Sequence, residues 1–87
     1  MRANNFAVFA LKRKASRAQA LDDFYKLDEM CRVLNYPLAI FVNIASAQHY
    51  SEDYSGPFPE QHRAFGVVLR GGVPRIFGGG APVLGPR

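Results

Sequence analysis

The sequence contains a single cysteine, no long hydrophobic run and no acidic residue near either end. The lone thiol, Cys31, excludes an internal disulfide and a thiolate-rich metal site, because each needs at least one further cysteine. The longest apolar runs, residues 6–11 and 37–44, are shorter than the roughly 20 residues that span a bilayer. The N-terminus also lacks a signal-peptide core. We therefore expect a soluble cytoplasmic protein with no metal and no cofactor.

Length and composition predict one small folded domain. A chain of 87 residues has room for a single core and buries about 60–65% of its unfolded surface. Hydrophobic residues make up 48% of the chain and charged residues 21%, unlike the composition of disordered sequences. The C-terminal end is rich in glycine and proline. We expect a domain over residues 1–80 and a flexible tail over residues 81–87.

The net charge of +4 is distributed unevenly along the chain. All seven acidic residues lie between Asp22 and Glu60, whereas the segments on either side carry only lysine and arginine. Because the acidic and basic segments can pair within the fold, the positive total says little about an acidic partner such as nucleic acid.

One segment has the pattern of an amphipathic helix. Ser16 and Gln19 have the spacing of a capping box, in which each side chain accepts from the backbone N–H of the other residue. Apolar residues then recur at helical spacing at Ala20, Phe24, Leu27, Cys31 and Leu34. Pro37 lacks a backbone N–H, which places the end of the helix near Asn35. Cys31 falls on the buried side, where a thiol is an inert apolar group.

Two segments beside this helix have the composition of β-strands. Residues 38–44 are rich in branched and aromatic side chains on both alternating sets, which predicts a central strand. Residues 6–11 are similar, and a short helix over residues 4–12 is the alternative. A strand–helix–strand order makes the two strands parallel.

A hairpin is predicted at the C-terminal end. Residues 62–70 and 73–77 flank Gly71-Gly72, and glycines supply the positive φ angles of a two-residue turn. Pro74 lacks a donor, which places its strand at a sheet edge. The predicted fold class is α+β, with one amphipathic helix packed on a three- to four-stranded mixed sheet. The order is β-α-β-β-β with a C-terminal antiparallel hairpin.

Strand alternation divides the predicted sheet into two apolar faces. We expect the helix to pack on the face that contains Leu38, Ile40, Val42, Ile44, Phe65, Val67, Leu69 and Ile76. The second face then contains Ala39, Phe41, Asn43, Val68, Val73, Arg75 and Phe77, with either Phe6 and Val8 or Phe9 and Leu11 from the first strand. A single helix cannot cover both faces, and a large bare apolar patch is rare on a monomer. The second face is covered by the long connection Ala45–Gln61, by a second copy or another protein, or by single-stranded nucleic acid.

Catalytic motifs are weak in this sequence. His49, Glu60 and His62 lie in or beside the long connection and are the candidate acid–base groups. Their spacing matches no metal site or catalytic triad, and a solvated polar loop is the favoured explanation for them. The glycines at 78–80 precede no helix and no lysine, unlike a phosphate-binding loop.

The leading functional hypothesis is a small non-enzymatic protein-interaction module of the inhibitor, immunity or adaptor type. Proteins of this class occur at this size in bacteria and phages, and a homodimer is compatible with it. The candidate binding residues are Phe41, Arg70, Arg75, Phe77, Tyr50, Tyr54 and Phe58. The alternative is a binder of single-stranded nucleic acid or a small metal-independent ribonuclease, because sheet phenylalanines beside arginines form base-stacking platforms. No membrane partner is expected.

Overall fold

The computed structural model describes residues 2–3 and 6–80, so the predicted tail over residues 81–87 lies outside the described residues. The elements are β1 (Arg2–Ala3), β2 (Ala7–Arg13), α1 (Arg17–Leu34), β3 (Leu38–Ile44), the 3-10 helix η1 (Ser51–Asp53), β4 (His62–Arg70) and β5 (Val73–Gly80). The strands form one sheet in the order β1-β2-β3-β4-β5. Strands β2, β3 and β4 are parallel, whereas β1 and β5 run antiparallel to their neighbours. The predicted α+β class and element order are confirmed, and the two-residue strand β1 is an addition.

Helix α1 begins and ends where its capping residues predict. The Ser16 hydroxyl accepts from the Gln19 backbone N–H at 3.2 Å, and the Gln19 side chain accepts from the Ser16 N–H at 2.9 Å. At the other end, Asn35 has a left-handed φ of 56°, and its N–H donates to the Cys31 carbonyl. Both ends of the helix are therefore specified by local sequence.

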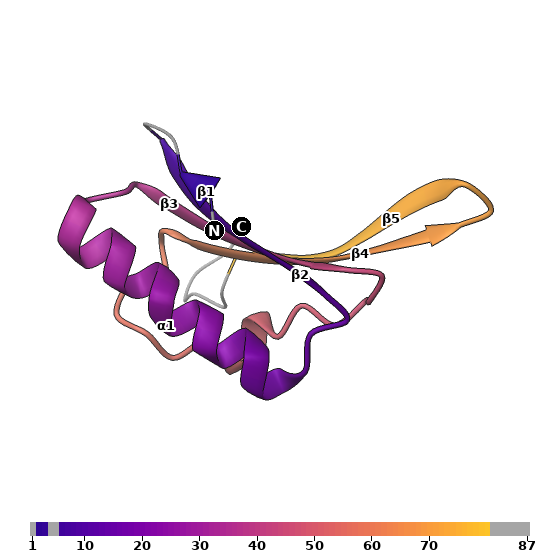
Figure 1. The fold of residues 1–87 in the computed structure, drawn as a ribbon, viewed down its shortest axis with the longest axis horizontal. Coiled ribbons are helices and arrows are strands. Elements are labelled where there is room, and N and C mark those ends of the chain that lie inside the picture. The colour runs from indigo at the N-terminus through magenta and orange to yellow at the C-terminus, as the bar shows by residue number, and fades with distance from the viewer. Residues whose placement is uncertain (1, 4–5, 81–87) are drawn as a thin grey trace.

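The C-terminal hairpin forms around the predicted two-glycine turn. Gly71 and Gly72 have φ angles of 56° and 79°, as a primed two-residue turn requires. Gly66 pairs with Phe77, and β5, which contains Pro74, lies at the edge of the sheet. Strand β5 continues to Gly80, beyond the predicted end at residue 77. Figure 1 shows the hairpin extending well past the end of the helix.

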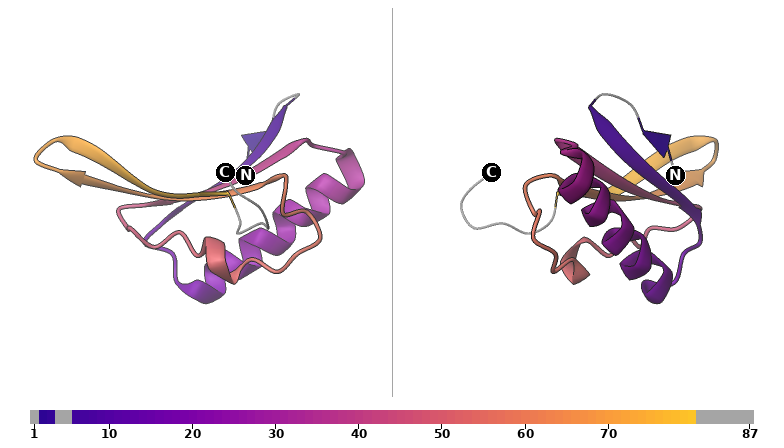
Figure 2. Two further views of the ribbon diagram at one scale, coloured as in Figure 1. Left: turned by 180° about the vertical axis from the view of Figure 1, so that it is seen from behind. Right: turned by 60° about the vertical axis from the view of Figure 1, so that its left-hand side comes forward.

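Helix α1 and the long connection over residues 45–61 lie on the same side of the sheet (Figures 1 and 2). The helix connects β2 to β3, and the 45–61 loop connects β3 to the parallel strand β4. This loop occupies the place that a second crossover helix takes in other parallel sheets. Together they cover one face, and the opposite face of the sheet has no layer of described residues on it.

The helix packs on the face opposite to the one predicted from the sequence. Apart from Ala7, the buried strand residues alternate along their strands and lie on the helix side; they are Val8, Ala10, Ala39, Phe41, Asn43, His62, Ala64 and Gly66. Of the apolar members of that set, Phe41 is the largest. Its ring packs against that of Phe24 in a T-shaped arrangement, with the ring centroids 5.2 Å apart. The small side chains let the helix approach the sheet closely, while rings from the helix and loop fill the space. Within residues 6–79, no helix is long and apolar enough to cross a membrane.

Candidate interaction surface

The side of the sheet without the helix carries a contiguous set of apolar side chains, here called the open face. Backbone pairing places Phe9 beside Ile40, Leu11 beside Val42, and Ile44 beside Val67. The open face consists of Ala7, which is buried, and of Phe9, Leu11, Arg13, Leu38, Ile40, Val42, Ile44, Arg63, Phe65, Val67, Leu69, Pro74 and Ile76. These residues include the set that the sequence assigned to the interior. The prediction of the helix-covered face was wrong because the size of aliphatic side chains does not decide which face of a strand the helix covers.

The side chains of the open face are most exposed near the C-terminal end of β2 and on the hairpin. Leu11 is 51% exposed, Ile76 is 67% exposed and Leu69 is 69% exposed. The remaining apolar members of the open face are less exposed, because neighbouring side chains surround them, and most are half-buried. A contiguous aliphatic surface of this kind marks an interaction site more often than an isolated exposed leucine does.

Charge is segregated between the open face and the layer that covers the other face. All seven acidic residues belong to α1 or to the 45–61 loop, and no strand contains one. The charged residues of the open face are Arg13 and Arg63. Arg63 donates from Nη1 to the backbone carbonyls of Glu60 and His62, each at 2.8 Å. The open face is therefore apolar with a positive rim.

The loop aromatics named as candidate binding residues pack inside the fold. The Tyr50 hydroxyl donates to the Ala15 carbonyl at 3.1 Å. The Tyr54 hydroxyl donates to Asp28 on α1 at 2.7 Å and accepts from the Phe58 N–H at 2.8 Å. All three rings contact the core cluster. These residues hold the 45–61 loop against the helix.

The sheet and hairpin candidates fall into two groups. Phe41 is fully buried beneath α1. Arg70, Arg75 and Phe77 lie on the hairpin, on the helix side of the sheet, and all three are exposed. The structure therefore does not bring Phe41 and Phe77 together as an accessible platform.

The candidate acid–base residues do not form one site. His62 is 1% exposed, and neither of its ring nitrogens has a hydrogen-bond partner within the described chain. Burial, together with the charge of Arg63, lowers the pKa of His62 to about 4. His49 accepts from the Ser51 N–H at 3.1 Å, and Glu60 is exposed. Among residues 6–79, no hydrogen bond, ion pair or ring contact joins these three side chains.

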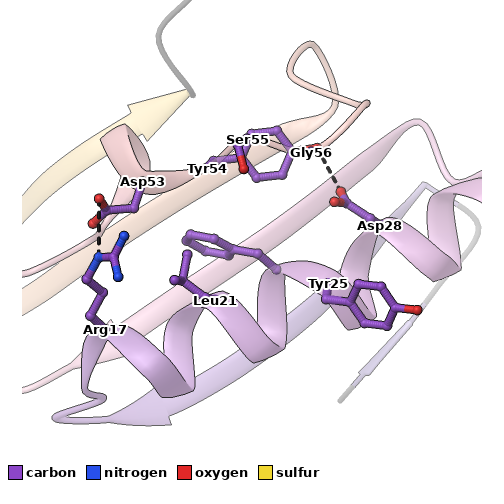
Figure 3. A pocket seen from close by; sticks show the side chains of 9 residues that line it. Arg17, Leu21, Tyr25, Asp28, Asp53, Tyr54, Ser55 and Gly56 are labelled. Carbon is purple, nitrogen blue, oxygen red and sulfur yellow. Dashed lines mark hydrogen bonds and ion pairs between the residues drawn. The ribbon is translucent and has the colours of Figure 1, made fainter.

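A cleft of about 310 Å³ lies between α1 and the loop, and Figure 3 shows the side chains around it. Arg17 forms an ion pair with Asp53 across the cleft at 3.4 Å. Asp28 is bound by the Tyr54 hydroxyl, and burial raises the pKa of its carboxyl. Burial and the hydrogen bond to Asp28 also raise the pKa of Tyr54. These polar groups pair with each other and so stabilise the loop. Few of their hydrogen-bonding positions are left for a ligand.

Asn43 has a structural role that the sequence pattern did not predict. It is fully buried on β3, where its Oδ1 accepts from the Ala15 N–H at 2.7 Å. Its Nδ2 donates to the Gln48 carbonyl at 2.8 Å. One amide thus connects the start of the helix to the start of the loop. The sequence signal for this role is that Asn43 is a lone polar residue in an otherwise apolar strand.

Metal binding has no support from the arrangement of side chains. Within the part of the chain that the structure describes, no cluster of three or more histidine, cysteine, aspartate or glutamate residues could hold an ion. Comparison of the chain with known protein families, curated proteins and solved structures gave no match. The geometry of the open face is therefore the basis for a functional proposal.

Proposed function

We propose that this protein is a small non-enzymatic interaction module that binds another protein chain through the open face of its sheet. The proposal is based on one observation: the parallel strands β2, β3 and β4 are covered on only one of their two faces by described residues. Parallel strands are normally covered on both faces, because both faces are apolar. A bound partner supplies the missing layer.

The exposed side chains determine how much free energy of binding the open face can supply. Leu11, Leu69 and Ile76 are each more than half exposed, and full burial of such a side chain contributes about 1.5–3 kcal/mol. Association itself costs at least ~4 kcal/mol. A partner therefore has to cover several of these side chains at once, which a contiguous face allows.

The structure gives less support to the 45–61 loop as the binding surface and to the ribonuclease alternative. The aromatic residues of the 45–61 loop are occupied within the fold, as Tyr54 and Phe58 illustrate. A ribonuclease needs an acid and a base that reach the same substrate. Of the three candidates, His62 is buried, and no interaction within residues 6–79 joins His49 to Glu60. An inhibitor, immunity or adaptor role fits a small scaffold that presents one apolar face.

The test is a selection of displayed peptides against the purified protein, followed by binding measurements with two matched variants. Ile76→Glu places a charge on the open face, where the side chain is 67% exposed. Val33→Glu places the same charge at a 59% exposed position on α1. Selected peptides are expected to lose at least tenfold in affinity for Ile76→Glu, because a carboxylate is costly to bury. Affinity for Val33→Glu is expected to stay unchanged.

Two outcomes contradict the proposal. One is the absence of any enriched peptide, together with a molar mass of a monomer, 9.7 kDa, in light scattering at every concentration. The other is a set of peptides that bind Ile76→Glu and the unmodified protein equally well, because such peptides use a different surface.

A further inference from the structure

We infer that the partner lays an amphipathic α-helix across the open face and carries acidic side chains along both flanks of that helix. This inference rests on the proposed function and adds the shape and charge of the partner. Three features of the open face lead to it: its aliphatic composition, the positions of its two arginines, and the absence of acidic residues from the strands.

Composition favours a protein segment over a nucleic acid. Single-stranded nucleic acids bind mainly by stacking their bases on exposed aromatic rings. The rings of the open face, Phe9 and Phe65, are half-buried, whereas the most exposed side chains are the aliphatic Leu69 and Ile76. Aliphatic side chains offer no stacking surface, but they pack well against the apolar stripe of a helix.

The two arginines lie at opposite corners of the open face. Arg13 ends β2, and Arg63 lies near the start of β4. Because β2 and β4 run parallel, these positions are at opposite ends of the sheet as well as on different strands. The other two corners are apolar, with Phe9 at one of them and Ile76 at the other. An apolar strip therefore runs diagonally between the two positive charges.

The dimensions of this strip match a helix. Arg13 pairs with Ile44, and Arg63 pairs with Ile40, four residues earlier on the same strand. With strands about 4.8 Å apart and a rise of about 3.3 Å per residue, the two arginine Cα atoms are roughly 16 Å apart. A helix with its side chains is about 10–12 Å wide. It fits between the arginines, with one guanidinium along each flank.

Charge argues against a second copy as the occupant. Two open faces placed against each other bring Arg13 and Arg63 of both copies together without any carboxylate, since every acidic residue lies in α1 or the loop. Uncompensated like charges at an interface oppose binding. Acidic residues on the flanks of a partner helix instead complement both arginines.

The experiment uses two fluorescent, stapled helical peptides with the same leucine stripe, one flanked by glutamate and one by lysine. Anisotropy measurements are expected to give about fivefold tighter binding of the glutamate peptide, the size expected from two exposed ion pairs. The double variant Arg13→Glu/Arg63→Glu is expected to reverse that preference. The double variant Arg70→Glu/Arg75→Glu removes the same charge from the helix side of the hairpin and is expected to keep the original preference. Circular dichroism confirms that all variants fold.

The remaining outcomes overturn the inference in distinguishable ways. Equal binding of the two peptides, or tighter binding of the lysine peptide, removes the charge argument but leaves the proposed function standing. A dimer in light scattering that Ile76→Glu dissociates makes a second copy the occupant, and the proposed function again survives. Binding of labelled oligouridylate with neither peptide bound overturns both proposals, as does a monomer that binds none of these probes.

Discussion

The imidazole ring of His62 lies flat on the phenol ring of Tyr54, with centroids 3.9 Å apart and 13° between the ring planes. The ring of Phe24 packs against the imidazole in a T-shaped arrangement, with the ring centroids 4.5 Å apart. These rings come from the start of β4, the 45–61 loop and α1. The stack therefore joins all three parts of the covered layer, and the protonation state of His62 bears on its stability.

Acid is expected to destabilise the protein through His62. Burial lowers the pKa of His62 from 6.5 to about 4, so the unfolded chain takes up a proton at a higher pH than the folded chain. The stabilising contribution is complete above pH 6.5 and is lost as the pH falls toward 4. With about 1.4 kcal/mol per pKa unit, we expect a loss on the order of 2–3 kcal/mol. Urea denaturation at pH 7.5 and 4.5 measures it.

The control for this prediction is His62→Phe, which keeps a ring in the stack and removes the titration. We expect the variant to be about 1 kcal/mol more stable at pH 7.5, because it buries no unpaired nitrogen. Its stability should change less between the two pH values. Asp28 has a raised pKa, and its titration acts in the opposite direction. An unchanged pH dependence in His62→Phe would assign the acid sensitivity to other groups.

Asn43 is expected to be essential for anchoring the start of the helix. Asn43→Leu keeps the volume but leaves the buried Ala15 N–H without its acceptor. The loss is about 2 kcal/mol in the free energy of unfolding, measured by urea denaturation. Gln48→Ala is the control, because only the backbone carbonyl of Gln48 bonds to Asn43. A loss of equal size in the control would show that the side-chain amide is not the cause.

Gly66 is expected to tolerate no side chain. A Cβ atom at this position lies 2.6 Å from the Ser46 carbonyl oxygen and 2.7 Å from the Ala47 carbonyl carbon. Gly66→Ala therefore pushes the loop off β4, and we expect a loss of roughly 1–3 kcal/mol. Gly71→Asn is the matched control, because its surroundings are open and asparagine accepts a positive φ. Thermal unfolding of both variants decides whether the loop contact limits stability.

The two faces of the sheet are expected to respond differently to substitution. Phe41→Leu, in the covered core, should lower stability by roughly 1–2 kcal/mol. Ile76→Thr, on the open face, should change stability by less than about 0.5 kcal/mol, because the side chain is 67% exposed. The same substitution should reduce the fluorescence of a bound hydrophobic dye. A large destabilisation by Ile76→Thr would mean that the face is already covered within the folded chain.

Local signals in the sequence predicted the secondary structure well. The capping box of Ser16 and Gln19, the two turn glycines and the edge position of Pro74 each depend on residues that are neighbours along the chain. Their conformations follow from backbone geometry and short-range hydrogen bonds, which sequence patterns encode directly. Parallel pairing of β2 with β3 also followed from the order of elements.

The choice of face was not predictable in the same way. Strand alternation defines two sets of side chains on β3, one containing Ile40 and the other Phe41, but it does not say which set meets the helix. Hydrophobicity favoured the aliphatic set. The smaller set is buried instead, because α1 and the loop supply rings of their own, such as Phe24 and Tyr54, and need space to place them.

The sequence by itself thus determined the helix, the strands, the turn and the existence of an apolar face that one helix cannot cover. Only the tertiary structure decided that this face is the aliphatic one, that Arg13 and Arg63 lie at its corners, and that His62 is buried. The physical reason is that secondary structure depends on neighbours along the chain, whereas the assignment of a face depends on volume shared among distant segments.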